Sequence, residues 1–298
     1  MNKQPLVSVV VASYNAEHTV LETLESVRNQ TYENIELILS DDCSKDNTVL
    51  VAQRWFDENA HYFKGGAHLL TAEKNQGVCA NFNKAIRSSK GEWIKIIAAD
   101  DLLLPNACLD YIQYINQNKD ANYVTANIDV YLEHFKPECL CETGKQSAPL
   151  SIYKEDVEGQ IHYAAKHMMV SGAAVFYSKT LFNDIQGYNE RYPFEDWPSV
   201  INSLEHGYKI HHLQKSTIGY RHHSSISNTS GKLYNIKFRR STRKFFKEKC
   251  FKYLDLKSKI KIIFQWFIEE FLEVTRLNYD NKLGRRIEHY ISMIKKHF

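Results

Sequence analysis

Short apolar runs alternate with segments of helical spacing along the first 115 residues. The apolar runs, which predict buried strands, are Leu6–Ala12, Ile35–Ser40, His68–Thr71 and Trp93–Ala98. Apolar residues at helical spacing predict helices over residues 17–30, 47–59, 77–88 and 105–118. Strand and helix therefore alternate four times, which predicts an α/β fold with a mostly parallel sheet flanked by helices on both faces.

The pattern after residue 118 is less regular. Strands are predicted over residues 123–130, 170–177 and 209–213, a loop over 139–150, and a short helix over 198–206. From residue 232 the chain is basic and helical, with two predicted stretches over 232–253 and 256–298.

Polar clusters fall where predicted strands end, at 12–15, 41–46 and 100–101. Open α/β sheets bind ligands at the carboxyl ends of their strands, so these clusters predict a binding site. The adjacent carboxylates of Asp100 and Asp101 repel each other, and a divalent cation would relieve that repulsion. The alternative is a solvated turn in which Asp101 caps the helix after Pro105.

Two further acidic pairs allow a functional and a purely structural interpretation. The pair Asp41-Asp42 could supply a carboxylate that accepts a hydrogen bond from a nucleotide base, or could form an Asx-rich turn that caps the next helix. Glu195 and Asp196 lie between Phe194 and Trp197, where a raised pKa would suit a general base. Asp196 could instead cap a helix that starts at Pro198.

The Tyr220-Arg221-His222-His223 stretch is a weaker candidate. His222 could ligate a metal and Arg221 could pair with a phosphate, whereas the alternative is a polar surface turn. Neither G-x-G-x-x-G nor G-x-x-x-x-G-K-[ST] occurs in the chain, so a dinucleotide fingerprint and a P-loop are both absent from the sequence.

Composition alone is uninformative, but the distribution of charge is not. The 298 residues are 43% hydrophobic and 24% charged, as in ordinary globular proteins, and the net charge is +3. Residues 1–230 carry 20 Lys and Arg against 28 Asp and Glu, a net of −8, whereas residues 231–298 carry 18 against 7, a net of +11. An acidic body thus precedes a basic tail.

Cysteines and hydropathy bear on location. The six cysteines are scattered, which favours free thiols in a reducing cytoplasm. No apolar run approaches the roughly 18 residues of a membrane span. We therefore expect a cytoplasmic protein, either soluble or peripheral on the inner face of the cell membrane.

The order of these motifs resembles the inverting family-two glycosyltransferases, which have the GT-A fold. The resemblance rests on PLVSVVVASYNAEHTVLETLESVRNQTYENIELILSDDCSKDNT at 5–48, EKNQGVCANFNKAI at 73–86 and GEWIKIIAADDLLLP at 91–105. It continues through SGAAVFYSKTLF at 171–182, GYNERYPFEDWPSVINSLEHGYKI at 187–210 and YRHHSSIS at 220–227. Residues 115–170 match weakly.

The resemblance implies how the chain is organised. Residues 1–115 would form a nucleotide-sugar-binding half, 116–230 the acceptor-binding and catalytic half of the same domain, and 231–298 a basic helical segment. The nucleotide pocket would be lined by Ala12, Ser13, Tyr14 and Glu17, with Asp42 holding a uracil-like base. Ala12 stands where some relatives carry a hydroxyl residue.

The resemblance also implies the chemistry. Asp100 and Asp101 match the DxD-type motif in the variant AADD, with Asp101 as the direct ligand of Mn²⁺ or Mg²⁺ and Asp100 beside it. Asp196 matches the catalytic base of the ED motif, and Glu195 is its neighbour. A cation would neutralise the leaving nucleoside diphosphate, and one base acting in one displacement would invert the anomeric centre.

Several partners and alternatives follow. The donor would be a nucleotide sugar, and the acceptor a saccharide or lipid-linked saccharide of surface polysaccharide synthesis. The basic tail is interpreted either as packed on the catalytic domain or as bound to an anionic membrane surface, and no nucleic acid partner is expected. A nucleotidyltransferase lacks support because its Gly-rich phosphate loop is missing. A non-catalytic carbohydrate-binding relative would not need Asp42, Asp101 and Asp196 together.

Overall fold

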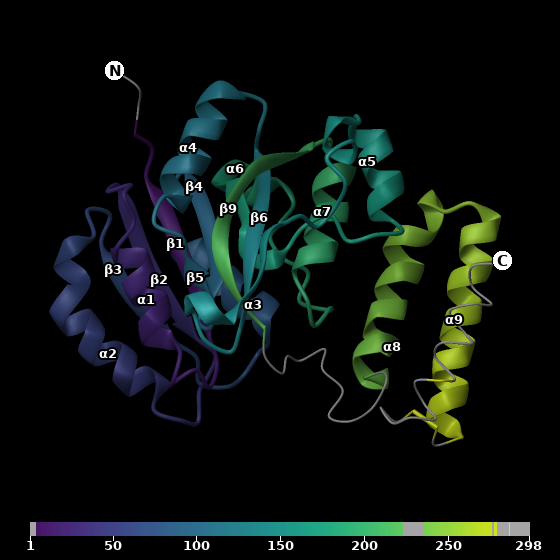
Figure 1. The fold of residues 1–298 in the computed structure, drawn as a ribbon, viewed down its shortest axis with the longest axis horizontal. Coiled ribbons are helices and arrows are strands. Elements are labelled where there is room, and N and C mark those ends of the chain that lie inside the picture. The colour runs from purple at the N-terminus through teal and green to yellow at the C-terminus, as the bar shows by residue number, and fades with distance from the viewer. Residues whose placement is uncertain (1–3, 223–234, 276, 279–285, 287–298) are drawn as a thin grey trace. The chain divides into compact units, whose positions relative to one another are not determined.

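The computed structural model describes residues 4–222, 235–275, 277–278 and 286 (Figure 1). The chain divides into two compact units, residues 1–223 and 224–298. The larger unit holds a nine-stranded mixed sheet in its described part, and strands from both predicted halves, 1–115 and 116–230, belong to this one sheet.

The first half of the sheet is parallel, as predicted. Its strands are β1 (Val7–Ser13), β2 (Ile35–Asp41), β3 (Ala67–Thr71) and β4 (Trp93–Ala98), in the spatial order β3-β2-β1-β4. Its helices are α1 (Val20–Arg28), α2 (Thr48–Asn59), α3 (Val78–Ser88) and α4 (Ala107–Gln117), with a short 3₁₀ turn η1 (Ala60–Tyr62) after α2. These elements confirm the alternation expected from the apolar pattern.

Side chains on successive positions of β1 point to opposite faces of the sheet, and helices cover both. Val7, Val9 and Val11 are fully buried in the core that includes side chains of α1, α2 and α4. Val10 is buried on the other face, where α3 contacts β1 and β2. Burial on both sides explains why these strands are almost uninterrupted apolar runs.

The rest of the sheet mixes parallel and antiparallel pairing, which the sequence pattern did not predict. Its strands are β5 (Leu102–Leu103), β6 (Tyr123–Leu132), β7 (Leu140–Lys145), β8 (Val175–Ser178) and β9 (Ile210–His222). β6 pairs in parallel with β9, whereas β8 is antiparallel to β4 and β6, β7 to β6, and β5 to β9. The helices are α5 (Val157–Ala164), α6 (Lys179–Asp184) and α7 (Asp196–Glu205), with 3₁₀ turns η2 (Pro137–Cys139), η3 (Ile152–Lys154) and η4 (Gly172–Ala174).

Three predictions in this half were wrong or incomplete. The expected loop at 139–150 contains β7, the expected strand at 170–177 begins with the turn η4, and the strand expected over 209–213 continues to His222. β7 is exposed and polar along most of its length, so its pairing with β6 leaves little trace in the apolar pattern. The fold class itself is confirmed as α/β.

The C-terminal unit begins its described part with α8 (Ile236–Phe245), which continues through a π turn η5 (Phe246–Cys250) and a 3₁₀ turn η6 (Phe251–Tyr253). After these comes α9 (Leu256–Val274). The side chain of Asn235 accepts from the Phe238 amide, and that of Asp255 accepts from the Ser258 amide, so both helices have N-caps. The predicted helical stretches are confirmed over these ranges. Most of residues 276–298 lies outside the described residues.

No helix among the residues that the structure describes combines the length and the apolar character that a membrane crossing requires. The six cysteines are all free thiols, in agreement with the sequence-based expectation.

One buried histidine predicts a pH dependence of stability. His212 on β9 is 7% exposed, its ring stacks on Tyr153 at 4.5 Å, and burial lowers its pKa to about 4. The unfolded chain therefore binds a proton near pH 6.5 that the folded protein excludes until about pH 4. Stability is complete above pH 6.5 and falls as the pH drops toward 4, by at most about 3 kcal/mol from this group.

Urea unfolding at a series of pH values measures this effect. His212→Phe retains the stack and should flatten the curve between pH 6.5 and 4, whereas His18→Gln, at a side chain that is 90% exposed, should leave it unchanged. Partial burial also lowers the pKa of His211, so some slope persists. Equal slopes in wild type and His212→Phe would contradict the assignment.

Candidate functional site

The turn after β1 is joined to the loop after β2 at the carboxyl edge of the sheet. Ser13 lies opposite Asp41 in the β1–β2 register, and its hydroxyl donates to the Asp41 carboxylate at 2.9 Å. The same carboxylate accepts from the Ser44 amide at 2.8 Å, so Asp41 makes the expected Asx turn, but this turn does not cap α2, whose N-cap residue is Asn47. Asn15, with φ of 51°, donates its amide to the Ser44 hydroxyl at 2.8 Å. The two segments thus form one rigid rim.

Glu17 strengthens this rim. Its carboxylate accepts from both the backbone and the side-chain amide of Asn47, each at 2.9 Å, and its own amide donates to Asp46 at 3.1 Å. Tyr14, by contrast, is 48% exposed and lies at the strand end, and Ala12 is partly exposed beside it. Of the predicted pocket residues, Tyr14 therefore has the surface available for a ligand, while Ser13 and Glu17 also hold the rim together.

Asp42 has a structural role that the sequence did not reveal. It is 4% exposed, and its two carboxylate oxygens accept from the backbone amides of Gln76 and Gly77 at 2.9 and 2.8 Å. The carboxylate thereby fixes the loop that leads into α3. Each oxygen still has a second lone pair, so this role is compatible with the predicted contact to a base.

Lys84 on α3 belongs to the same region and was assigned no role from sequence. Its Nζ is buried and has no hydrogen-bond partner among the described residues. Burial lowers its pKa, while the negative charges of Asp42 and Asp41 oppose that shift. A cation that faces these carboxylates without a direct bond could have been found only from the three-dimensional arrangement.

Asp100 and Asp101 follow β4 directly, in the turn before β5. Asp101 is 3% exposed, and its Oδ1 accepts from the Arg221 amide at 2.9 Å, so it does not cap α4, whose N-cap residue is Asn106. Burial and the adjacent charge of Asp100 raise the pKa of Asp101 well above its usual range. Two neighbouring carboxyl groups with this unfavourable electrostatics fit a divalent cation, which prefers oxygen ligands and favours the ionised form.

Arg221 fastens β9 to this turn. Its Nε donates to the Asp100 carbonyl at 2.8 Å, its other two nitrogens bind the Glu133 carbonyl and the Glu22 carboxylate, and its guanidinium lies 4.2 Å from the centre of the Phe135 ring. Because these contacts occupy the guanidinium, its suggested role as a phosphate partner is not supported. Arg221 instead positions the acidic turn.

His222 is exposed at the end of β9 and does not complete a three-residue metal site with Asp100 and Asp101. More generally, no group of three or more His, Cys, Asp or Glu side chains suited to a metal occurs in the described part of the chain. His223 lies outside the described residues. A cation held by the two aspartates would complete its coordination shell with oxygen atoms of water or substrate.

The third acidic pair lies at the start of α7, which begins at Asp196 rather than at Pro198 as predicted. The Asp196 Oδ1 accepts from the Trp197 amide at 2.7 Å, and neither acid makes a side-chain cap, so the capping alternative is not supported. Burial raises the pKa of Asp196, and burial together with the Asp196 charge raises the pKa of Glu195 to about 8. The pair therefore gives up its protons at higher pH than two exposed carboxyl groups would.

A buried lysine holds the turn η4, which lies beside this pair. Lys95 on β4 is fully buried, and its Nζ donates to the carbonyls of Ile96 at 2.7 Å, Val175 at 3.3 Å, and Ala173. Ala173 belongs to η4, whose Gly172 lies so near Glu195 that an added Cβ would stand 2.6 Å from the Glu195 Oε1. Lys95 thus links β4, which precedes the Asp100 turn, to the turn η4 that lies beside Glu195.

Tyr220 shows that the two acidic groups share a neighbourhood. Burial raises its pKa, and the charges of Asp101, Asp100 and Asp196 raise it further. One phenol on β9 therefore senses both the carboxylates at the end of β4 and the carboxylate at the start of α7. The predicted metal-binding and base residues, about 95 positions apart in sequence, thus lie within electrostatic range of one side chain.

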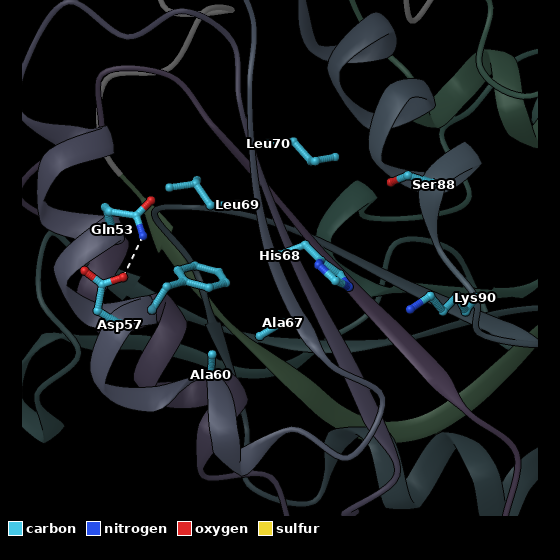
Figure 2. A pocket seen from close by; sticks show the side chains of 10 residues that line it. Gln53, Asp57, Ala60, Ala67, His68, Leu69, Leu70, Ser88 and Lys90 are labelled. Carbon is cyan, nitrogen blue, oxygen red and sulfur yellow. Dashed lines mark hydrogen bonds between the residues drawn. The ribbon is translucent and has the colours of Figure 1, made fainter.

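A separate cavity of about 580 Å³ lies along β3, between α2 and the end of α3. Figure 2 shows His68, Leu69 and Lys90 among its walls, with Gln53 donating to Asp57 at 2.8 Å. None of the predicted site residues lines it. The carboxyl edge of the sheet, rather than this cavity, carries the candidate chemistry.

Comparison with known proteins identifies the family of the chain. The model of glycosyl transferase family 2 matches residues 8–186, which is more than half of the chain. The chain therefore belongs to glycosyl transferase family 2, and the resemblance recognised in the sequence is confirmed.

Three proteins similar to this chain are named or described by what they bind or transfer. The UDP-Glc:alpha-D-GlcNAc-diphosphoundecaprenol beta-1,3-glucosyltransferase WfgD of Escherichia coli is 37% identical over 101 residues, 34% of this chain and 37% of WfgD. Staphylococcus aureus TarS 1-349, solved with UDP-GlcNAc, matches 80% of this chain and 64% of its own with a TM-score of 0.58 at 18% identity. The mannosyltransferase PcManGT of Pyrobaculum calidifontis, solved with GDP-Man and Mn²⁺, matches 71% and 55% with a TM-score of 0.53 at 18% identity.

These likenesses have limits. At 18% identity the two structures establish a shared fold, which is the GT-A arrangement expected from sequence. The chain spans less than half the length of several curated relatives that it matches.

The contacts of Asp42 generate a prediction. Asp42→Asn replaces one acceptor oxygen with an amide donor that faces a backbone N–H. The free energy of unfolding should therefore fall by about 1–2 kcal/mol. Thermal unfolding checks this, with Glu58→Gln on the exposed side of α2 as the matched control. Unchanged stability of Asp42→Asn would show that the loop before α3 does not depend on this carboxylate.

Proposed function

We propose that the protein is a metal-dependent inverting glycosyltransferase that moves a sugar from a nucleoside-diphosphate sugar to a hydroxyl of a saccharide or lipid-linked saccharide. The observation that carries the proposal is that the charges of Asp100, Asp101 and Asp196 all raise the pKa of one residue, Tyr220. Family membership supports a nucleotide-sugar donor, and so do the compounds named with the two solved structures, UDP-GlcNAc with TarS and GDP-Man with PcManGT. We propose a UDP-linked sugar.

Each acidic group would supply one need of the reaction. A bound divalent cation neutralises the charge that develops on the leaving diphosphate. Asp101, with Asp100 beside it, would hold that cation, and the Mn²⁺ named with PcManGT supports this assignment. Arg221, through its contacts to the carbonyl of Asp100 and to the carboxylate of Asp101, would keep both residues in place.

Asp196 would act as the base. Its raised pKa makes it a better proton acceptor than an exposed aspartate. It would take the proton of the acceptor hydroxyl as that oxygen forms a bond to the anomeric carbon, while the bond from this carbon to the diphosphate oxygen breaks and its electron pair leaves with the nucleoside diphosphate. A single displacement of this kind inverts the anomeric centre.

The acceptor and the location are proposed from relatives and charge. The name of WfgD specifies a diphosphoundecaprenol-linked acceptor, which supports a lipid-linked saccharide in surface polysaccharide synthesis. We propose that the enzyme works in the cytoplasm, at the inner face of the membrane that would contain such an acceptor.

The direct test is incubation with a panel of UDP-, dTDP- and GDP-sugars, with Mn²⁺ or with EDTA. We expect release of nucleoside diphosphate that requires the cation. Asp196→Asn should lower that release by roughly three orders of magnitude, since the base is lost, while donor affinity changes little. Formation of pyrophosphate from a sugar phosphate and a nucleoside triphosphate would instead identify a nucleotidyltransferase.

Glu195→Gln provides the matched variant. Burial and the Asp196 charge raise the pKa of Glu195 to about 8, so ionisation above that pH would add a negative charge to a site that must bind an anionic donor, and kcat/KM of the wild type should fall there. Glutamine mimics the protonated form, and the variant should stay active without this fall. Full activity of Asp196→Asn, or loss of all activity in Glu195→Gln, would overturn the assignment of the base.

A further inference from the structure

An apolar stripe runs along one side of α9. It consists of exposed large hydrophobic side chains spaced three or four positions apart, namely Leu256, Ile260, Ile263, Phe264, Phe267, Phe271 and Val274. Their exposed fractions range from 40% for Phe264 to 78% for Val274. At 100° per residue these positions fall on a single face of the helix, so the stripe is continuous from the first turn to the last.

The opposite face of α9 is already occupied within the C-terminal unit. Glu269 and Leu272 are buried, Leu272 packs in a small core with Ile236 of α8, and the Trp266 ring stacks on Phe251 at 5.4 Å. The helix is therefore held by one side, while the stripe points away from the core of its own unit.

The charges around the stripe select the kind of partner. The acidic residues Glu269 and Glu270 of α9 pair with arginines of α8, including Arg243 at 2.8 and 2.5 Å, respectively. Lys257 and Lys259 lie on either side of the stripe at the start of the helix, with Lys261 one turn further, and no acidic residue occurs between Leu256 and Ile268. The free charge beside the apolar face is therefore positive.

We propose that this stripe docks on an anionic lipid bilayer, with α9 lying in the plane of the membrane interface. Apolar and aromatic side chains on one face, with lysines beside them, are the arrangement by which surface helices bind negatively charged lipid. The inference rests on the proposed function, because a lipid-linked acceptor lies in such a surface. It would bring the enzyme to its acceptor.

Vesicle co-sedimentation of the full-length chain tests the proposal, using phosphatidylcholine alone and phosphatidylcholine mixed with phosphatidylglycerol. The wild type should bind the mixed vesicles, and added salt should weaken that binding because it screens the lysines. Ile263→Ser with Phe267→Ser should weaken it roughly tenfold or more, since two large apolar side chains no longer enter the lipid. Lys257→Glu with Lys259→Glu should abolish the preference for anionic lipid.

The control is Leu50→Ser with Leu132→Ser, at side chains of the larger unit that are 51% and 53% exposed, close to the 51% of Ile263. This variant should bind vesicles as the wild type does. Binding by the stripe variant that equals the wild type, or no binding by the wild type, would overturn the proposal.

Two other occupants give distinct results. If another part of the chain covers the stripe, the stripe variant will unfold at a lower temperature than the control, and if a second copy covers it, light scattering will show a dimer that the variant disrupts. Either result overturns membrane docking.

Release of nucleoside diphosphate, measured without vesicles, separates the docking proposal from the proposed function. Release without vesicle binding defeats only the docking surface, whereas vesicle binding without consumption of any sugar nucleotide defeats the proposed function.

Discussion

The parallel pairing of β1 with both β2 and β4 is the constraint on which the site depends. Ala12 lies opposite Ser40 on one side and Ala98 on the other, so the three strands end at the same level. The segments that follow them, with Asp41 and Asp42 on one side and Asp100 and Asp101 on the other, must then share one edge of the sheet. A slip of one residue would exchange the side chains on the two buried faces of β1 and separate Ser13 from Asp41, so core packing and this hydrogen bond fix the register.

An edge crowded with carboxylates needs compensation, and the structure shows how it is arranged. Backbone amides donate hydrogen bonds to the carboxylates of Asp42 and Asp101, and a hydroxyl and an amide donate to that of Asp41. The guanidinium of Arg221 donates to the carbonyl of Asp100 in the turn that carries the acidic pair. The repulsion that remains appears as the raised pKa of Asp101. Residual unfavourable charge of this kind suits a site that binds a cation only together with its substrate.

Much of the N-terminal half could be predicted from sequence, because each strand is a local apolar run and each helix has its own periodicity. The bounds of β4 were predicted correctly, and those of β1 and β2 to within one residue. The remaining strands could not be predicted in the same way, because each depends on pairing with a strand that is distant in sequence. Two-residue β5 exists only through Leu102 and Leu103 opposite Gly219 and Ile218, and nothing local distinguishes it from a turn.

The same distinction holds for the site. The acidic residues stood out as motifs, whereas the groups that position them did not, since Arg221 binds a turn 120 residues away and Asp42 binds amides 34 and 35 residues away. Lys95 is another example: a lysine inside an apolar strand predicts nothing by itself, and its three carbonyl partners come from the fold. Sequence thus indicated the chemistry, and the structure added the framework that aims it.

The most direct measurement of the central claim is calorimetric titration of UDP into the wild type and into Asp101→Asn, with Mn²⁺ and with EDTA. Asparagine keeps an oxygen that can accept from the Arg221 amide but loses the charge, so the fold should persist while the cation is lost. The account predicts UDP binding that requires Mn²⁺ in the wild type and falls roughly tenfold or more in the variant. Equal affinity for UDP under all four conditions would contradict a cation site at the end of β4.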